Sequence, residues 1–172
     1  MFSLSLNKGN YKMSDTTLTT ENVIKANTPH RPAFFDPGTL DWNDWVMPGT
    51  YFKLLNLNEL TGGFTMILKV DPDVTAPVHY HSGGIEVYVI EGEFGYGDDD
   101  RGGTGTYALE SGGSIHQPSS PGGVTMFAVV HGPLVGYHED GSIAVVVDCR
   151  LMYEMAMENN AADHITVTNT FI

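Results

Sequence analysis

The chain has 172 residues, of which 41% are hydrophobic, and a formal net charge of −13 at pH 7. This length predicts one domain with a substantial core, and the composition excludes a wholly disordered chain. The negative charge repels nucleic-acid phosphate and anionic membrane, so we expect neither as a partner. The single cysteine, Cys149, excludes an intrachain disulfide and suits a reducing compartment, which makes the cytoplasm the expected location.

The N-terminal region, residues 1–31, is polar and lacks a sustained hydrophobic period. We expect it to be an arm that is partly disordered or packed on a partner subunit, and Met13 within it is a possible alternative start. Its apolar run is too short for a signal peptide, and no stretch of the chain approaches the length of a membrane span. Residues 32–172 are expected to form a single domain.

Short apolar runs follow from about Pro32, separated by glycine, proline and aspartate. They predict strands over residues 50–57, 63–70, 76–81, 86–92, 93–97, 103–110, 124–132, 133–140 and 142–148. The sequence "EDGS" at 139–142 is a hairpin signal, because Asp-Gly tolerates the positive φ of a tight turn. No helical pattern lies between the strands, which disfavours crossover α/β folds. Regularly spaced short strands predict an all-β small barrel or double-sheet jelly roll.

One helix is predicted near the C-terminus, over residues 149–164, which are rich in Leu, Met, Ala and Glu. A single helix after the last strand does not connect two strands of a sheet. We expect it to pack at the end of the sheet or against a second subunit.

Two histidines stand one residue apart at His79 and His81, on a predicted strand. Residues i and i+2 of a strand point to the same face, so the two imidazoles should lie together. An isolated pair of this kind is weak evidence, but residues 105–116 are spaced so that a second hairpin could return His116 to it. A borderline metal such as Fe(II) or Zn(II) readily accepts three neutral imidazole donors.

Two stretches, "HYHSGGIEVYVIEGEF" at 79–94 and "GTYALESGGSIHQP" at 105–118, resemble the paired motifs of the cupin superfamily. The fitting positions are His79, His81, Glu86 and Gly92 in the first motif, with Gly105, Gly113 and His116 in the second. One residue fewer than usual separates Glu86 from Gly92, and Ser111 stands where the family prefers proline. The resemblance implies a cupin-type double-stranded β-helix, a jelly-roll barrel, over roughly residues 50–148, in which Gly92 closes a hairpin.

A closer resemblance lies in "MFAVVHGPLVGYHEDGSIAVV" at 126–146 and "GGFTMILKVDP" at 62–72. These stretches look like the branch that holds acetylacetone-cleaving dioxygenase and 2,4'-dihydroxyacetophenone dioxygenase. That branch implies Fe(II) bound by three histidines without a glutamate, which here would be His79, His81 and His116. It also implies a small ketone and O2 as substrates, and a homodimer or homotetramer. Zn(II) or Ni(II) can occupy such a site in purified protein, because imidazole binds them more tightly.

Three neutral ligands leave the charge of a divalent ion uncancelled and coordination positions open. A β-diketone or an α-hydroxyketone can lose a proton and chelate through two oxygens, and the metal lowers the cost of that enolate. Glu86 stands at the offset of the metal glutamate in germin-type cupins. We expect it instead to act as the catalytic carboxylate, as a proton acceptor or as a partner that orients a histidine, while direct ligation stays open.

The substrate pocket has five candidate residues. Tyr88 and Ile90 share the strand parity of Glu86, whereas the other three lie on a later strand that should border the cavity: Met126, Phe127 and Val129. Ordinary core packing is the alternative for each of them, since the register is not known. His131 is expected at the surface or in an interface.

The leading functional hypothesis is a non-haem Fe(II) dioxygenase that cleaves a carbon–carbon bond in a small β-diketone or aryl α-hydroxyketone. The alternatives are a non-catalytic metal or ligand sensor, and a metal-dependent isomerase or decarboxylase that uses the same site. Fold-level resemblance does not choose among these three.

Overall fold

The computed structural model describes residues 34–167. The contacts between residues divide the chain into two units, Met1–Phe35 and Asp36–Ile172. The fold described below is that of the second unit. The N-terminal arm expected over residues 1–31 lies outside the described residues and stays a prediction.

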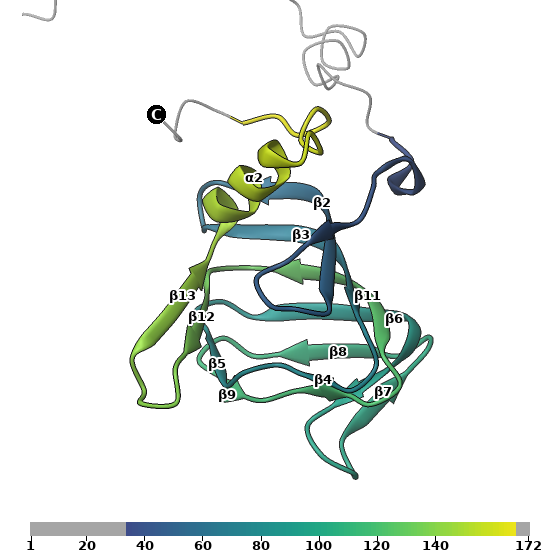
Figure 1. Ribbon diagram of the computed structural model, residues 1–172, viewed down its shortest axis with the longest axis vertical. Coiled ribbons are helices and arrows are strands. Elements are labelled where there is room, and N and C mark those ends of the chain that lie inside the picture. Colours follow the sequence, from purple (N-terminus) through teal and green to yellow (C-terminus); the bar gives the residue numbers. More distant parts are fainter. Residues whose placement is uncertain (1–33, 168–172) are drawn as a thin grey trace, which may run out of the picture. The chain divides into compact units, whose positions relative to one another are not determined.

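The regular elements of the second unit are strands, apart from a 3-10 turn at its start and one α-helix near its end (Figure 1). The elements are η1 (Pro37–Thr39), β1 (Asn43–Asp44), β2 (Thr50–Asn58), β3 (Gly63–Val70), β4 (Val74–Thr75), β5 (His79–His81), β6 (Ile85–Gly95), β7 (Arg101–Gly103), β8 (Tyr107–Glu110), β9 (Ile115–His116), β10 (Ser119–Ser120), β11 (Val124–Val130), β12 (Leu134–Tyr137), β13 (Ile143–Val147) and α2 (Cys149–Glu158).

The strands form two sheets. The longer sheet has nine strands in the order β1-β2-β3-β11-β6-β10-β4, with β7 and β8 also paired to β6. The shorter sheet has four strands in the order β13-β12-β5-β9. Strands distant in the sequence are neighbours in both sheets, and every described pairing is antiparallel. The prediction of an all-β, cupin-type jelly roll with a short C-terminal helix is confirmed.

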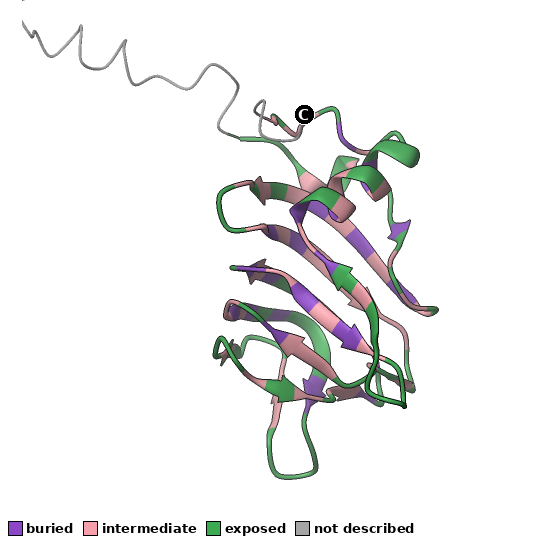
Figure 2. Ribbon diagram, turned by 90° about the vertical axis from the view of Figure 1, so that its left-hand side faces the viewer, coloured by how far each residue is buried: buried purple, intermediate pink, exposed green. Residues whose placement is uncertain are grey.

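The core follows from the alternation of side chains along the long strands. On β2, Phe52 and Leu54 are buried, whereas Lys53 between them points the other way. On β11 the buried positions likewise alternate with more exposed ones, as the bands of colour in Figure 2 show for the sheet as a whole. Burial of each large apolar side chain stabilises the fold by about 1.5–3 kcal/mol relative to exposure. The two-residue period therefore decides which face of each strand borders the interior.

Strand β6 is longer than the sequence predicted. It runs without interruption from Ile85 to Gly95, where two strands and a hairpin at Gly92 were expected. Its pairing with β11 shifts register between Thr125 and Met126, so Gly92 lies beside a bulge and not in a turn. Gly92 has φ +79°, and a Cβ at this position would collide with the carbonyl oxygen of Gly123 on the adjacent segment. Only glycine fits both the backbone conformation and this close approach.

Helix α2 begins after Asp148, whose side chain accepts hydrogen bonds from the backbone amides two and three residues later. Such a cap stabilises a helix by about 1 kcal/mol. The helix packs Met152 and Ala156 into the core and ends at Glu158, earlier than predicted, since Asn160 adopts a left-handed conformation with φ 54°. Within residues 34–167, no helix has both the length and the apolar character needed to cross a membrane.

Candidate metal centre

Three histidines from two neighbouring strands meet in the shorter sheet. His79 and His81 occupy alternate positions of β5, and His116 on β9 is paired directly with His79. One ring nitrogen from each histidine can be chosen so that the three atoms lie within 4.8 Å of one another. The structure therefore brings together the three residues that the sequence singled out as metal ligands.

The hydrogen bonds around these rings leave nitrogen lone pairs facing one another. Nδ1 of His79 donates to the carbonyl oxygen of Pro77 at 2.9 Å, which leaves Nε2 as the free ligand atom. This arrangement, a ligand imidazole oriented by a backbone carbonyl, is common in metal sites. Nε2 of His81 lies 3.0 Å from Nε2 of His116. With metal–nitrogen bonds of about 2.1 Å, two ligands at a right angle are separated by about 3 Å, so this spacing fits a shared divalent ion.

Burial keeps these imidazoles neutral. His81 is completely inaccessible to solvent, and burial lowers its pKa to about 3, with smaller effects from His79 and His116. Burial also lowers the pKa of His79 and of His116 below the ordinary value. A histidine must be deprotonated to bind a metal, so all three are in the ligating form at neutral pH.

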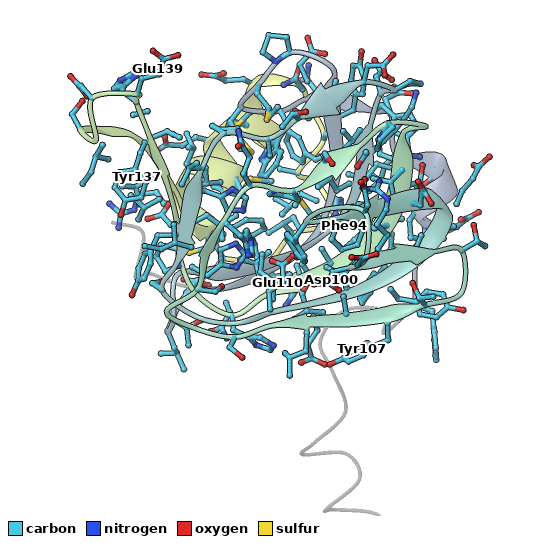
Figure 3. The ribbon with its side chains drawn as sticks, turned by 90° about the horizontal axis from the view of Figure 1, so that it is seen from below. Phe94, Asp100, Tyr107, Glu110, Tyr137 and Glu139 are labelled. Atoms are coloured by element: carbon cyan, nitrogen blue, oxygen red, sulfur yellow. The ribbon has the colours of Figure 1, made fainter. Side chains whose placement is uncertain are left out.

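A buried carboxylate, Glu110 at the end of β8, completes the cluster. Its Oε2 lies 3.4 Å from Nδ1 of His81 and 3.4 Å from Nε2 of His116. Its Oε1 accepts a hydrogen bond from the hydroxyl of Tyr96, whose ring also contacts the ring of His116. Burial raises the pKa of Glu110, and the hydrogen bond from Tyr96 offsets part of that rise. Figure 3 shows Glu110 among the strands, in the interior of the unit.

Sequence reasoning did not identify Glu110 as a site residue. The residue lies within the second cupin-like motif, six positions before His116, but nothing in that spacing reveals its direction. The pairing of β8 with β6 sets it opposite Ile85, a buried residue, and so turns it inward. The only signal that could have identified Glu110 is that a carboxylate occupies a strand position that is buried.

Glu86, the expected catalytic carboxylate, lies on the outer face of β6, away from the histidine cluster. The buried residues of this strand are Ile85 and Val87, and Glu86 between them faces outward. Its Oε1 accepts a hydrogen bond from Nε2 of His131 at 2.8 Å, and its Oε2 accepts one from the hydroxyl of Tyr107 at 3.0 Å. The hydrogen bond from His131, and to a smaller extent the one from Tyr107, lowers the pKa of Glu86. The expectation for Glu86 is therefore corrected: strand alternation directs it away from the histidine cluster.

Four of the five pocket candidates also face outward. Tyr88 and Ile90 are half exposed on β6, and on β11 the outward positions are Phe127 and Val129. Only Met126 points into the interior, where it borders a cavity. The reason is again the two-residue period: Tyr88 and Ile90 share the parity of Glu86, and that parity is the outer one.

A cavity of about 140 Å³ lies between the sheets. His79 and Glu110 are among the few polar residues in its wall, so the histidine cluster and the cavity form one site. The rest of the lining is largely apolar and includes Met66, Leu68, Val70, Val87, Met126 and Ala128. An apolar space beside a compact polar cluster is the usual form of a small-molecule site.

Two antiparallel β-sheets with three histidines clustered on the shorter one are the features that the cupin resemblance implied. The family model of the ChrR cupin-like domain matches residues 30–135, and the chain belongs to this family. A search of curated proteins found no match.

Solved structures share the fold at low sequence identity. An RmlC-like cupin protein from Ralstonia eutropha JMP134 is 19% identical with a TM-score of 0.70, covering 81% of this chain and 94% of its own. An acetylacetone dioxygenase from Acinetobacter johnsonii is 17% identical with a TM-score of 0.64, covering 76% and 93%. A candidate acetylacetone dioxygenase from Methylibium petroleiphilum PM1 is 22% identical with a TM-score of 0.65, covering 78% and 98%.

Proposed function

We propose that this protein is a non-haem Fe(II) dioxygenase that cleaves a carbon–carbon bond in a small ketone with O2. The observation that carries the proposal is the cluster of three neutral histidines, one of which, His79, lies in the wall of an apolar cavity. The similarity of the fold to an acetylacetone dioxygenase supports the same reaction class. The sequence resemblance to that branch is a further, separate support.

The residues that would hold the ion are His79, His81 and His116. An Fe(II) ion bound there would supply Lewis acidity toward a chelating enolate and a place for O2 to react. The three histidines contribute no negative charge, so a chelating anion is the ligand that complements them. Neutral ligands therefore favour a substrate that can lose a proton and bind through two oxygens.

Glu110 replaces Glu86 as the proposed catalytic carboxylate. Its side chain borders the cavity and approaches two of the three histidines. Burial raises the pKa of Glu110, which makes its carboxylate a stronger base toward a substrate proton than an exposed glutamate. The hydroxyl of Tyr96 holds Oε1, so Oε2, which also faces Nδ1 of His81, is the oxygen proposed to accept that proton.

The size of the cavity favours a small β-diketone over an aryl α-hydroxyketone. The cavity measures about 140 Å³. An engineered apolar cavity of about 150 Å³ in another protein binds benzene. A short aliphatic diketone is of comparable size, whereas an aryl hydroxyketone adds a side chain and hydroxyl groups to a ring. The apolar lining also excludes water from the reacting carbon.

A non-catalytic metal or ligand sensor is the second candidate. The family match is to a cupin-like domain and names no reaction. The same histidines and cavity would bind a metal and a small molecule without turnover. A metal-dependent isomerase or decarboxylase would also use this site, with a different proton path.

Oxygen uptake distinguishes these functions. The full chain, loaded anaerobically with Fe(II), is mixed with a panel of short β-diketones and aryl hydroxyketones, and O2 consumption and cleavage products are measured. We expect one O2 consumed per diketone cleaved, with slower or no reaction of the aryl compounds. Stoichiometric iron without oxygen uptake on any ketone would contradict the dioxygenase and favour the sensor.

A further inference from the structure

A short segment between β1 and β2 forms one wall of the cavity. Its three residues, Trp45, Val46 and Met47, all line the space that His79 and Glu110 also border. The segment precedes both histidine-bearing stretches in the chain, so neither of those motifs indicated it. Neither the metal ligands nor the proposed base accounts for its place in the wall.

The backbone of this segment is fixed by a tight turn before β2. The amide of Trp45 donates to the carbonyl oxygen of Thr50 at 2.9 Å. The amide and the hydroxyl of Thr50 both donate to the carbonyl oxygen of Met47, at 3.2 Å and 2.6 Å. Gly49 completes the turn with φ +76°, which suits glycine, and its carbonyl oxygen accepts a hydrogen bond from the amide of Asp71 at 2.8 Å. The wall is therefore preformed.

The ring of Trp45 is held from behind by the C-terminal helix. Its Nε1 donates to Sδ of Met152 on α2 at 3.2 Å, and Met152 is completely buried. Because an indole has one donor and no acceptor, this contact satisfies its only polar group. The rest of the ring is apolar, and Trp45 borders the cavity. Trp45 is thus placed to contact a ligand through the apolar part of its ring.

The cavity reaches the protein surface beside this segment. Of the described residues that line the cavity, only Val46 and Pro77 are exposed, and Val46 is 36% accessible to solvent. The chain segments that carry them adjoin each other, since a Cβ added at Gly49 would lie 2.7 Å from Cγ2 of Val74. Exposed residues in the wall of an otherwise covered cavity mark its entrance, which here lies between Val46 and Pro77.

This entrance lies next to a metal ligand. The carbonyl oxygen of Pro77 accepts the hydrogen bond from Nδ1 of His79 at 2.9 Å, so a residue at the edge of the entrance also orients a ligand imidazole. His79 and Glu110 both line the cavity. A small molecule that passes Val46 therefore meets an apolar wall and polar side chains within one short space.

We propose that Trp45, Val46 and Met47 form the entrance and the specificity-determining wall of the cavity, for a small molecule with alkyl groups and chelating oxygens. The molecule enters between Val46 and Pro77. Its oxygens turn toward His79, and an alkyl group packs against Trp45 and Met47. A tryptophan ring and an adaptable methionine side chain suit a short alkyl group and offer little to a charged one. The identity of the ligand, a short β-diketone, rests on the proposed function, whereas the position of the entrance does not.

Tryptophan fluorescence tests whether the ligand contacts this wall. The chain has two tryptophans, so Trp42→Phe leaves Trp45 as the single reporter. Trp45→Phe leaves Trp42, which is 40% exposed and does not line the cavity. The full chain, loaded with redox-inert Zn(II), is titrated with acetylacetone, and the signal is corrected for absorption by the diketone. We expect saturable quenching of Trp45 and a linear, non-saturating decrease for Trp42. Absence of saturable quenching of Trp45 would overturn the proposal.

Association kinetics test the position of the entrance. In the Trp42→Phe protein, Val46→Phe should slow the association of acetylacetone about 10-fold or more, because it narrows the passage. The dissociation constant should change less, since entry and exit are slowed alike. The matched control is Val146→Phe, because Val146 is 44% exposed on β13 and does not line the cavity. Equal association rates in these two variants would show that the ligand enters elsewhere.

A shortened side chain tests the selection of ligands by the wall. Met47→Ala should lower the dissociation constant of 3,5-heptanedione relative to that of acetylacetone by about 10-fold, since the longer diketone fills the space that is released. Met157→Ala is the matched control, because Met157 is 52% exposed on α2 and does not line the cavity. The same ratio in both variants would contradict a role of Met47 in specificity.

Oxygen uptake separates this proposal from the proposed function. Saturable quenching of Trp45 without O2 consumption by the Fe(II)-loaded chain would support the wall and contradict the dioxygenase. Consumption of O2 with acetylacetone, without saturable quenching of Trp45, would contradict the wall alone. Equal zinc content and equal unfolding midpoints across the variants exclude misfolding as the cause of a difference.

Discussion

Nδ1 of His81 lies 3.4 Å from Oε2 of Glu110, in the solvent-excluded interior, yet makes no hydrogen bond with any described residue. A buried imidazole nitrogen without a partner costs free energy that a stable fold rarely tolerates. A metal bound at Nε2 would leave the proton on Nδ1 and draw the carboxylate toward it. This contact links Glu110, which the sequence did not identify as a site residue, to the histidines that the sequence did identify as candidate metal ligands.

Removal of one histidine should abolish metal binding. His116→Ala deletes one of three ligands, and we expect stoichiometric metal to be lost, with affinity reduced at least 100-fold. His138→Ala, which removes a histidine outside the cluster, should retain metal. Elemental analysis after equilibration with Fe(II), Zn(II) or Ni(II) provides the measurement. Equal metal content in the two variants would show that the ligand assignment is wrong.

Glu110→Gln should separate metal binding from turnover. The substitution keeps the volume but removes the base, so we expect kcat to fall by about 10²–10⁴-fold while metal content changes little. Glu86→Gln, on the outer face, is the matched control and should leave kcat within a factor of two or three of wild type. Steady-state oxygen uptake measures both. A larger loss in the Glu86 variant would restore the original assignment of the catalytic carboxylate.

Met126→Ala should enlarge the cavity and change substrate preference. Met126 is buried and borders the cavity, so its truncation should lower the free energy of unfolding by about 2–5 kcal/mol. We also expect kcat/KM for aryl hydroxyketones to rise relative to that for short diketones. The control is Val129→Ala on the outer side of the same strand, which should leave the ratio unchanged. A ratio that is the same in both variants would mean that the substrate binds elsewhere.

The stability of the metal-free protein should fall on mild acidification. Burial lowers the pKa of His81 to about 3, whereas the unfolded chain has the ordinary value of 6.5. Between these two values the unfolded state binds a proton that the native state does not, so the free energy of unfolding falls as pH falls. The slope approaches about 1.4 kcal/mol per pH unit for this residue.

Urea unfolding of metal-free protein between pH 7 and pH 5 measures this slope. The variant His81→Asn should show a shallower dependence, whatever its absolute stability. An unchanged slope in the variant would contradict the assigned burial of His81. His79 and His116, whose pKa values burial also lowers, add to the slope, whereas Glu110, whose pKa burial raises, opposes it, so the comparison with His81→Asn isolates the contribution of His81.

The local patterns of the sequence accounted for most of the fold. Short apolar runs and glycine-rich turns predicted the strands, and the Asp-Gly turn between β12 and β13 occurs where it was expected. The failure at Gly92 is instructive, because glycine serves both turns and bulges. Which of the two occurs here depends on the backbone of Gly123, distant in the sequence, and on the register shift against β11.

For the site, the sequence alone determined that His79 and His81 share one face of a strand, since that follows from the two-residue period of any strand. Only the tertiary structure decided that this face meets His116, that Glu110 and not Glu86 turns inward, and that Met126 alone among the pocket candidates borders the cavity. Each of these depends on how strands far apart in the chain pair with one another. A shift of one residue would reverse every side chain, and the burial of the core as a whole selects the register.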